Sequence, residues 1–397
     1  MIIFLFLLAS VSLASYLTPD NFQVTDGSKL ELKMNAITAV AENRDIPTDL
    51  SRSKLRSYKA KLMLYNIVPI KTVNVDVVSD TMLVPCGTPF GIKMFTNGVV
   101  IVGVADIQTK SGMINPAAVS GLKVGDVITA INGQAVNTNS EIGDAILNSK
   151  GSILKLTVCR NNSVLSVDLQ PVKSETDLTY KAGLWVRDST AGIGTLTFYN
   201  PSTKCFAGLG HGVCDNDTNE LMPLLDGEIV PVTINGITKG EKGVPGELRG
   251  YFSTDTAMGT LDKNVTEGVY GTMNVVPKGK AIEVAMKQEV KPGAAKIMTT
   301  IDGSGPRYYD AVIEKIDYRE DIGSKNLIIH ITDTTLLSKT GGIIQGMSGS
   351  PVIQNGKIVG AVTHVFVNDP TRGYGIFAES MLETSQNYKP NIKSKAS

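Results

Sequence analysis

Short alternations of apolar and polar residues, separated by turn-forming glycine and asparagine, recur along most of this chain. Clear examples are residues 153–160 and 163–169, which the turn pair Asn161-Asn162 joins. Alternation with a period of two residues is typical of half-buried β-strands, and paired asparagines favour a tight hairpin turn. Helical spacing of apolar residues is confined to short segments such as residues 140–147. The pattern therefore predicts a mainly β protein with a small α+β domain.

Residues 82–172 combine such strands with two short helices. Asn115-Pro116 suits the start of the first helix, because proline fits the first helical turn. Glycine-containing turns, an apolar strand and the tight-turn pair Asn132-Gly133 follow. The run AAVSGLKVGDVITAINGQAV (117–136) resembles the PDZ family closely. This resemblance implies a PDZ domain over residues 82–172, to which a peptide ligand adds as an extra strand beside the sheet.

The same resemblance implies a place for the loop that holds the terminal carboxylate of the peptide. Gly91, Ile92 and Lys93 occupy that place, and Lys93 stands where the family usually has an aromatic residue. Binding of an internal peptide segment is therefore an open alternative. A packing domain that binds no peptide is another.

The regions on either side of this domain carry fewer motifs. Residues 1–18 are uncharged and mostly apolar, which favours a signal peptide or signal anchor, although no basic residue precedes the apolar run. Residues 19–81 are expected to form either a small β unit or an extended linker, and residues 173–179 a second linker. Residues 180–397 alternate short strands with glycine-containing turns, which predicts a sandwich or a barrel.

Composition narrows the possible functions. The chain has 42% hydrophobic residues, and its 38 basic residues balance 38 acidic ones. Without a basic surface, no nucleic-acid partner is expected, and a protein substrate is favoured. The four cysteines form no CxxC pair and the three histidines are scattered, so neither a metal nor another cofactor is expected. Cys205 and Cys214 could form a disulfide or remain free thiols.

The strongest chemical signal is the run QGMSGSP (345–351) between two apolar strands. Glycines on both sides of Ser348 let the backbone turn tightly and leave room for an incoming carbonyl group. Acyl transfer also needs N–H donors aimed at the developing oxyanion. The run resembles the nucleophile loop of chymotrypsin-like peptidases. This resemblance implies that Ser348 is the nucleophile and that the N–H groups of Gly346 and Ser348 form the oxyanion hole; Ser350 is the alternative nucleophile.

A serine nucleophile needs a base, usually histidine, to take its proton. His211 lies in the small-residue run GLGHG (208–212), which favours an accessible ring, and it is the predicted base. His330 alternates within a strand and is assigned to the sheet. Thr363 and His364 lie on the strand after the nucleophile hairpin. Chymotrypsin-like folds contact the substrate there, so both are candidate substrate-binding residues, with ordinary sheet packing as the alternative.

The acid that would orient the histidine has two candidates. Asp333, at the end of the strand that contains His330, is the first candidate for a carboxylate that selects the reactive tautomer. Asp255 is nearer to the usual separation from His211 in chymotrypsin-like peptidases. A Ser–His dyad without an acid is a third possibility.

Several stretches together resemble the stage IV sporulation protein B peptidases. They are the PDZ run, GLWVRDSTAGIGTLTFYNP (183–201), GLGHG (208–212) and residues 331–377. The resemblance implies a PDZ domain followed by a chymotrypsin-like double β-barrel over residues 180–397. It also supports His211 and Ser348 as catalytic residues, and it favours Asp333 and Thr363 as required for function.

The family further implies a biological role. Its members are exported to the space between forespore and mother cell, where they cleave themselves. They also cut a membrane-bound inhibitor of an intramembrane protease, which then activates a late sigma factor. The partners expected from this resemblance are that membrane-bound regulatory protein, the chain's own N-terminal segment and a peptide ligand of the PDZ domain. A non-catalytic PDZ adaptor is the alternative, although an intact His211 and an undamaged nucleophile loop disfavour it.

Overall fold

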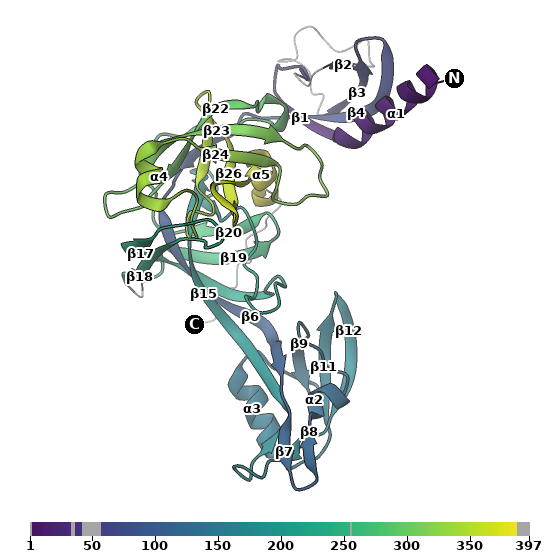
Figure 1. Cartoon of the computed structure of the whole chain (residues 1–397), viewed down its shortest axis with the longest axis vertical. Helices are drawn as coiled ribbons and strands as arrows, with labels where there is room; N and C mark the ends of the chain where they lie inside the picture. Colours follow the sequence, from purple (N-terminus) through teal and green to yellow (C-terminus); the bar gives the residue numbers. More distant parts are fainter. Residues whose placement is uncertain (1, 33–35, 42–56, 255, 387–397) are drawn as a thin grey trace.

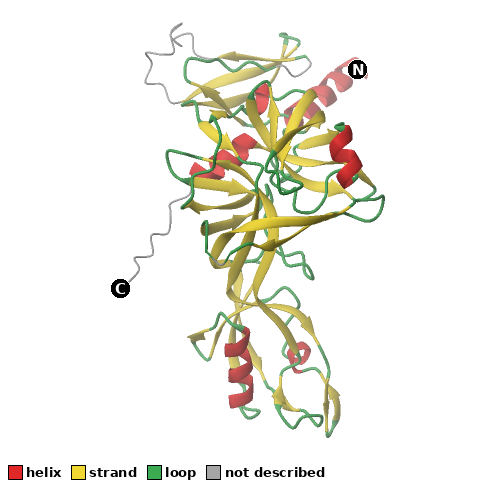
Figure 2. Cartoon of the chain, turned by 90° about the vertical axis from the view of Figure 1, so that its left-hand side faces the viewer, coloured by secondary structure: helices red, strands yellow, loops and turns green. Residues whose placement is uncertain are grey.

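The computed structural model describes residues 2–32, 36–41, 57–254 and 256–386. It is elongated, with an N-terminal unit at one end, a unit of strands and short helices at the other, and two barrels between them (Figure 1). Strands dominate and helices are few (Figure 2), so the predicted mainly β architecture is confirmed.

The N-terminal unit joins a helix to a small sheet. Helix α1 (Ile2–Leu17) lies against β4. The strand order is β1 (Asn21–Thr25), β4 (Val68–Val78), β3 (Ser57–Leu64) and β2 (Ile37–Ala41), with β1 parallel to β4. Phe22, Leu62 and Val75 belong to an apolar cluster within this unit, so its described residues have a core of their own. No helix in the described part of the chain is long and apolar enough to cross a membrane.

The unit at the opposite end, called the PDZ unit below, comprises residues 99–173 and the start of β15. Its helices are α2 (Pro116–Val119) and α3 (Asn139–Asn148); its strands are β7 (Ile107–Thr109), β8 (Gly112–Ile114), β9 (Val127–Ile131), β10 (Gln134–Ala135), β11 (Leu154–Arg160) and β12 (Ser163–Leu169). Thr138 and Glu141 form a capping box that starts α3. Asn161 and Asn162 both have positive φ angles, as the predicted hairpin turn between β11 and β12 requires.

The first barrel is a ring of six strands. Its order is β6 (Pro89–Val104), β17 (Leu224–Thr238), β19 (Gly259–Val265), β20 (Gly268–Met273), β16 (Cys205–Gly208) and β15 (Leu184–Tyr199), and β15 pairs with β6 to close it. Short strands β5 (Met82–Pro85), β18 (Glu247–Phe252) and β21 (Ile282–Glu283) extend the sheet. Phe90, Phe206 and Ile229 are fully buried in its core.

The second barrel is a closed ring of six strands from the C-terminal part of the chain. Its order is β22 (Gly293–Thr299), β23 (Arg307–Ile316), β24 (Leu327–Ile331), β27 (Asp369–Phe377), β26 (Lys357–Phe366) and β25 (Pro351–Gln354). Helix α4 (Thr334–Thr340) follows β24, and helix α5 (Ala378–Gln386) follows β27. Ile297, Ile313 and Ile329 are completely buried inside this barrel. The predicted double barrel is therefore confirmed.

The boundary between the PDZ unit and the first barrel differs from the expected one. Strands β6 and β15 are long and run from the barrel into the PDZ unit (Figure 1). The first half of β6 pairs with β17 on one edge and β15 on the other, so residues 89–96 belong to the barrel. The short strands β13 (Val172–Lys173) and β14 (Tyr180–Lys181) pair across the expected linker at 173–179.

The predicted carboxylate-binding loop at Gly91, Ile92 and Lys93 is therefore wrong. All three residues lie near the start of β6, with a strand paired on each side. A Cβ atom at Gly91 would meet the ring of Phe252 at 2.4 Å, so this position is closely packed. Backbone groups that already belong to two ladders cannot bind a peptide carboxylate.

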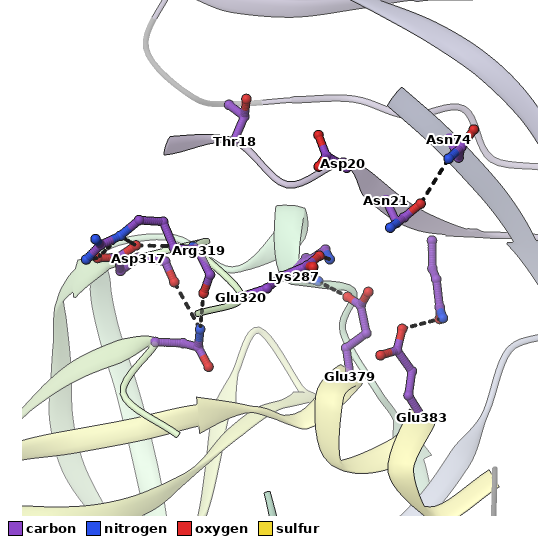
Figure 3. A network of polar contacts seen from close by, with 12 residues as sticks. Thr18, Asp20, Asn21, Asn74, Lys287, Asp317, Arg319, Glu320, Glu379 and Glu383 are labelled. Carbon is purple, nitrogen blue, oxygen red and sulfur yellow. Dashed lines mark hydrogen bonds and ion pairs between the residues drawn. The ribbon is translucent and has the colours of Figure 1, made fainter. Parts of the chain in front are cut away.

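The N-terminal unit contacts the second barrel through a polar network (Figure 3). Gln23 donates to Glu383 of α5 at 2.6 Å, and the Gln288 side chain donates to the carbonyl of Gln23 at 2.5 Å. The N–H of Lys287 donates to Glu379, the second carboxyl group of α5 in this network. Burial raises the pKa of Glu379 to about 7.

Candidate active site

The loop that carries Ser348 belongs to the second barrel and is hydrogen-bonded to the first. It lies between α4 and β25, and its backbone is held by strand β15 of the first barrel. Thr195 donates from its N–H to the carbonyl of Ser348 at 2.9 Å and from its hydroxyl to that of Gly346 at 2.7 Å. Thr197 donates to the carbonyl of Gly349 at 2.8 Å. These bonds orient the loop carbonyls toward the first barrel.

The same loop presents two free backbone donors. The N–H groups of Gln345, Met347, Gly349 and Ser350 all bond within the chain, whereas those of Gly346 and Ser348 have no such partner among the described residues. Gly346 has φ +94°, a conformation that favours glycine. The two free donors are those predicted for the oxyanion hole, and this geometry supports that role.

Ser348 and Ser350 lie in different environments. Ser350 is completely buried and its hydroxyl bonds to Thr299 and to the carbonyl of Met347, so it is unsuited to attack a substrate. Ser348 is half-buried and lines the cavity between the barrels. Its hydroxyl donates to the carbonyl of Thr363 at 2.7 Å.

His211 follows β16 on a turn in which Leu209 and Gly210 both have positive φ angles. Its Nδ1 lies 2.8 Å from the carbonyl oxygen of Gly212. Because a carbonyl can only accept, Nδ1 carries the proton and Nε2 is left with a free lone pair. Burial lowers the pKa of His211 below its usual 6.5, which keeps the ring neutral near pH 7. A neutral ring in this tautomer is the form that can act as a base.

A second imidazole lies beside the first. The ring centroids of His211 and His364 are 4.6 Å apart, with 35° between the ring planes. Burial, the neighbouring His211 and Lys325 lower the pKa of His364 to about 4. His364 is therefore neutral when His211 takes up a proton. Thr363, next to it, is buried and its hydroxyl donates to the carbonyl of Ser324 at 2.9 Å.

A cavity of about 1060 Å³ brings these groups together at the junction of the two barrels. The predicted site residues that line it are Gly346, Ser348, His211, Thr363 and His364, together with Ile92, which was predicted for the PDZ loop. Residues 190–193 of β15 and residues 322–325 before β24 form further parts of its wall. A polypeptide lying in this cavity would have a hydroxyl, an imidazole and two free N–H donors within one space. This arrangement suits acyl transfer.

Asp333 is not part of this site. Its carboxylate accepts from the N–H of Leu336 at 2.9 Å and from that of Asp310 at 3.4 Å, which makes it the N-cap of α4. It does not line the cavity, so the prediction of a triad acid at this position is wrong. Asp255 lies outside the described residues. Within the described part of the chain, the orienting bond to His211 comes from Gly212 and from no carboxylate.

Two supporting groups were missed from the sequence. Arg187 of β15 pairs with Asp215 and, at 2.8 Å, with Asp217, which fixes the loop that follows His211. Thr195 holds the nucleophile loop from the same strand. Both residues lie in the stretch 183–201 that resembled the peptidase family, but only their placement reveals their partners. Cys205 and Cys214 are both free thiols.

The fold and the site together define a serine endopeptidase with a PDZ domain. Residues 178–382, just over half of the chain, match the family model described as SpoIVB peptidase S55, and residues 90–171 match the PDZ domain model. The chain belongs to the SpoIVB peptidase S55 family.

Two solved structures are similar to parts of this chain. The PDZ domain of the SdrC-like protein from Listeria monocytogenes is 26% identical, with 23% of this chain and 87% of that chain covered and a TM-score of 0.19. The HtrA-type protease AlgW, solved with a decapeptide, is 10% identical, with 50% of this chain and 53% of that chain covered and a TM-score of 0.30.

Proposed function

We propose that Ser348 and His211 carry out peptide-bond hydrolysis through an acyl-enzyme. Nε2 of His211 takes the proton of Ser348 as its oxygen attacks the peptide carbonyl, and the N–H groups of Gly346 and Ser348 hold the oxyanion. Protonated His211 then gives its proton to the leaving amine, and water releases the acyl product. The observation that carries this proposal is the pair of unbonded N–H groups beside a serine that shares its cavity with a neutral histidine.

The orienting role of a triad acid is assigned to the carbonyl of Gly212. A carboxylate would both select the tautomer and stabilise the imidazolium, whereas a carbonyl does mainly the first. The enzyme is therefore proposed to work as a Ser–His dyad with a backbone acceptor, and His364 and Thr363 to contact the substrate beside it.

The biological role is proposed from family membership. The enzyme would be exported, act outside the cytoplasm or at the membrane between forespore and mother cell, cleave its own N-terminal segment, and cut a membrane-bound regulatory protein. That cut would let an intramembrane protease activate a late sigma factor. The large apolar side chains Leu5, Phe6 and Leu8 of α1 are exposed, which supports a membrane-associated or processed N-terminus.

The test compares the full-length wild-type protein with Ser348→Ala, with Ser338→Ala on the exposed face of α4 as the control. Each protein is incubated alone, its fragments are mapped by N-terminal sequencing, and labelling by a fluorophosphonate probe is measured. Wild type and Ser338→Ala should give the same fragments and the same label, and Ser348→Ala neither. Absence of both fragments and label in the wild type would favour the adaptor alternative.

A further inference from the structure

Strand β15 connects the PDZ unit to the catalytic loop. At its start, Leu184 and Val186 pack in the apolar cluster of the PDZ unit together with Ile142 and Ile146 of α3. Near its end, Thr195 bonds to the carbonyl of Ser348. One continuous strand therefore contributes to both places, and Figure 1 shows how far it extends.

One edge of β15 is unpaired along most of its length. The other edge pairs with β6 from residue 184 to residue 195, with register shifts at 185/186 and 187/189, and then with β5 from Phe198, whereas pairing with β16 on this edge begins only at Leu196. Residues 184–193 are all described, and none of them has a strand partner on this side.

The backbone groups on this edge are available for pairing. Leu196 donates toward β6, to Thr88, whereas Thr195 donates to the opposite side, to Ser348. Because successive residues of a strand point their N–H groups to opposite sides, those of Ile193, Ala191 and Ser189 also point away from β6. Ser189 and Ala191 are exposed to solvent. The edge is therefore an open ladder of donors and acceptors.

The chemistry of the site decides which part of a substrate lies along this edge. Protonated His211 must reach the leaving amine, so the segment downstream of the scissile bond leaves on the side of His211. His211 and β15 both belong to the first barrel, and residues 190–193 line the same cavity as Ser348. Thr363, whose carbonyl accepts from Ser348, is on the second barrel. The segment upstream of the scissile bond is therefore expected to lie beside Thr363.

We propose that the downstream segment of a protein substrate adds to the free edge of β15 as an extra antiparallel strand and continues to α3 of the PDZ unit. The direction follows because the catalytic end of β15 is its C-terminal end, so a segment that leaves the site runs against the strand. From residue 193 to residue 184 the edge spans roughly 30 Å, or about ten substrate residues. This proposal rests on the proposed peptidase function and gives the PDZ unit a role in holding the downstream end.

The side chains along the edge favour recognition through the backbone. Arg187 is engaged by Asp215 and Asp217, and Asp188 accepts from the N–H of Asn139 at the start of α3. Because both charged side chains already have partners, the edge is suited to an extended polypeptide that is selected by its length and strand propensity. PDZ domains bind peptides by the same strand addition, but here the accepting strand is β15 and not residues 91–93.

The test uses peptides that contain one mapped cleavage sequence followed by 2, 4, 6, 8, 10 or 12 residues. With the full-length enzyme, kcat/KM should rise by about 10-fold or more up to roughly ten downstream residues and then level off. N-methylation of alternate downstream residues in the longest peptide should remove this gain in one register and leave it in the other, because only one set of N–H groups faces β15.

A variant tests the enzyme side. Ser189→Pro removes one N–H donor from the free edge and should reduce the long-to-short ratio of kcat/KM at least several-fold, whereas Ser189→Ala should keep that ratio. The N-methylated peptides decide the matter even if the proline variant fails to fold. A rate independent of downstream length, or insensitive to N-methylation, would overturn strand addition and leave the peptidase standing. If Ser348-dependent cleavage of every peptide is absent, the proposed function fails and this inference with it.

Discussion

The two barrels have the same number of strands but differ in how far their strands take part in other units of the chain. The second barrel closes on itself, and its own loop places Ser348. Strands β6 and β15 of the first barrel continue into the PDZ unit. The ion pair between Arg187 of β15 and Asp215 holds the loop that follows His211. The proposed nucleophile therefore comes from a loop of the second barrel, which Thr195 and Thr197 of the first barrel hold by hydrogen bonds. The position of His211, the proposed base, depends on a strand that extends into another unit.

The largest expected effect is loss of the base. His211→Ala should lower kcat/KM by about 1,000-fold or more, because it removes the proposed base that takes the proton of Ser348. The control is His330→Ala, which removes a histidine of the second barrel that pairs with Glu314 at 3.0 Å. Steady-state kinetics measures both variants. Nearly equal losses of kcat/KM would contradict the assignment of His211 as the base.

Removal of Arg187 tests whether the first barrel positions the base. Arg187→Met leaves the buried carboxylate of Asp215 unpaired, which should cost about 2 kcal/mol of stability and lower kcat/KM by roughly 10- to 100-fold. The control, Arg372→Met, breaks the more exposed pairs with Glu314 and Asp369 on the second barrel and should cost less than about 1 kcal/mol. Chemical denaturation and kinetics measure both effects.

Asp333 tests the self-contained character of the second barrel. Asp333→Ala removes the N-cap of α4 and should cost about 1 kcal/mol of stability, with a moderate fall in kcat because α4 leads into the nucleophile loop. Asp333→Ser also caps a helix and should restore both quantities. A triad acid would behave differently: serine would not rescue activity, and the pH profile would change.

Glu379 tests how the N-terminal unit is joined to the second barrel. Its pKa is about 7 in the folded protein against 4.5 as the reference value, so the folded state binds the extra proton. The contribution of Glu379 to stability should be greatest below pH 4.5 and be lost as the pH rises through 7. Glu379→Gln should therefore raise stability by about 2 kcal/mol at pH 8 and have little effect near pH 4.5. Equal effects at both pH values, in denaturation curves, would contradict this.

The smallest effect is a shift in the pH profile. Burial lowers the pKa of His211, and the base must be neutral to act, so the acid limb of kcat/KM should have its midpoint below pH 6.5. Activity should then persist to lower pH than an ordinary histidine would allow. A midpoint above 6.5 would indicate a carboxylate partner for His211 that the described residues do not contain.

Local signals in the sequence were enough for the elements and for the chemistry of the nucleophile. Period-two alternation located β11 and β12, and the glycines around Ser348 located a loop whose free N–H groups now support an oxyanion hole. Those signals depend on residues close together in the chain. Asp333 was misassigned because the sequence alone does not distinguish a carboxylate that caps a helix from one that orients a histidine.

By itself, the sequence determined that this is a mainly β serine peptidase with a PDZ domain and a serine framed by glycines at position 348. Only the tertiary structure decided that Gly212 orients His211, that residues 91–93 lie inside a barrel and that β15 links the PDZ unit to the catalytic loop. The reason is physical. Propensity and turn chemistry act over a few residues, whereas the partner of a buried polar group or of a strand edge is chosen by packing between segments far apart in the chain.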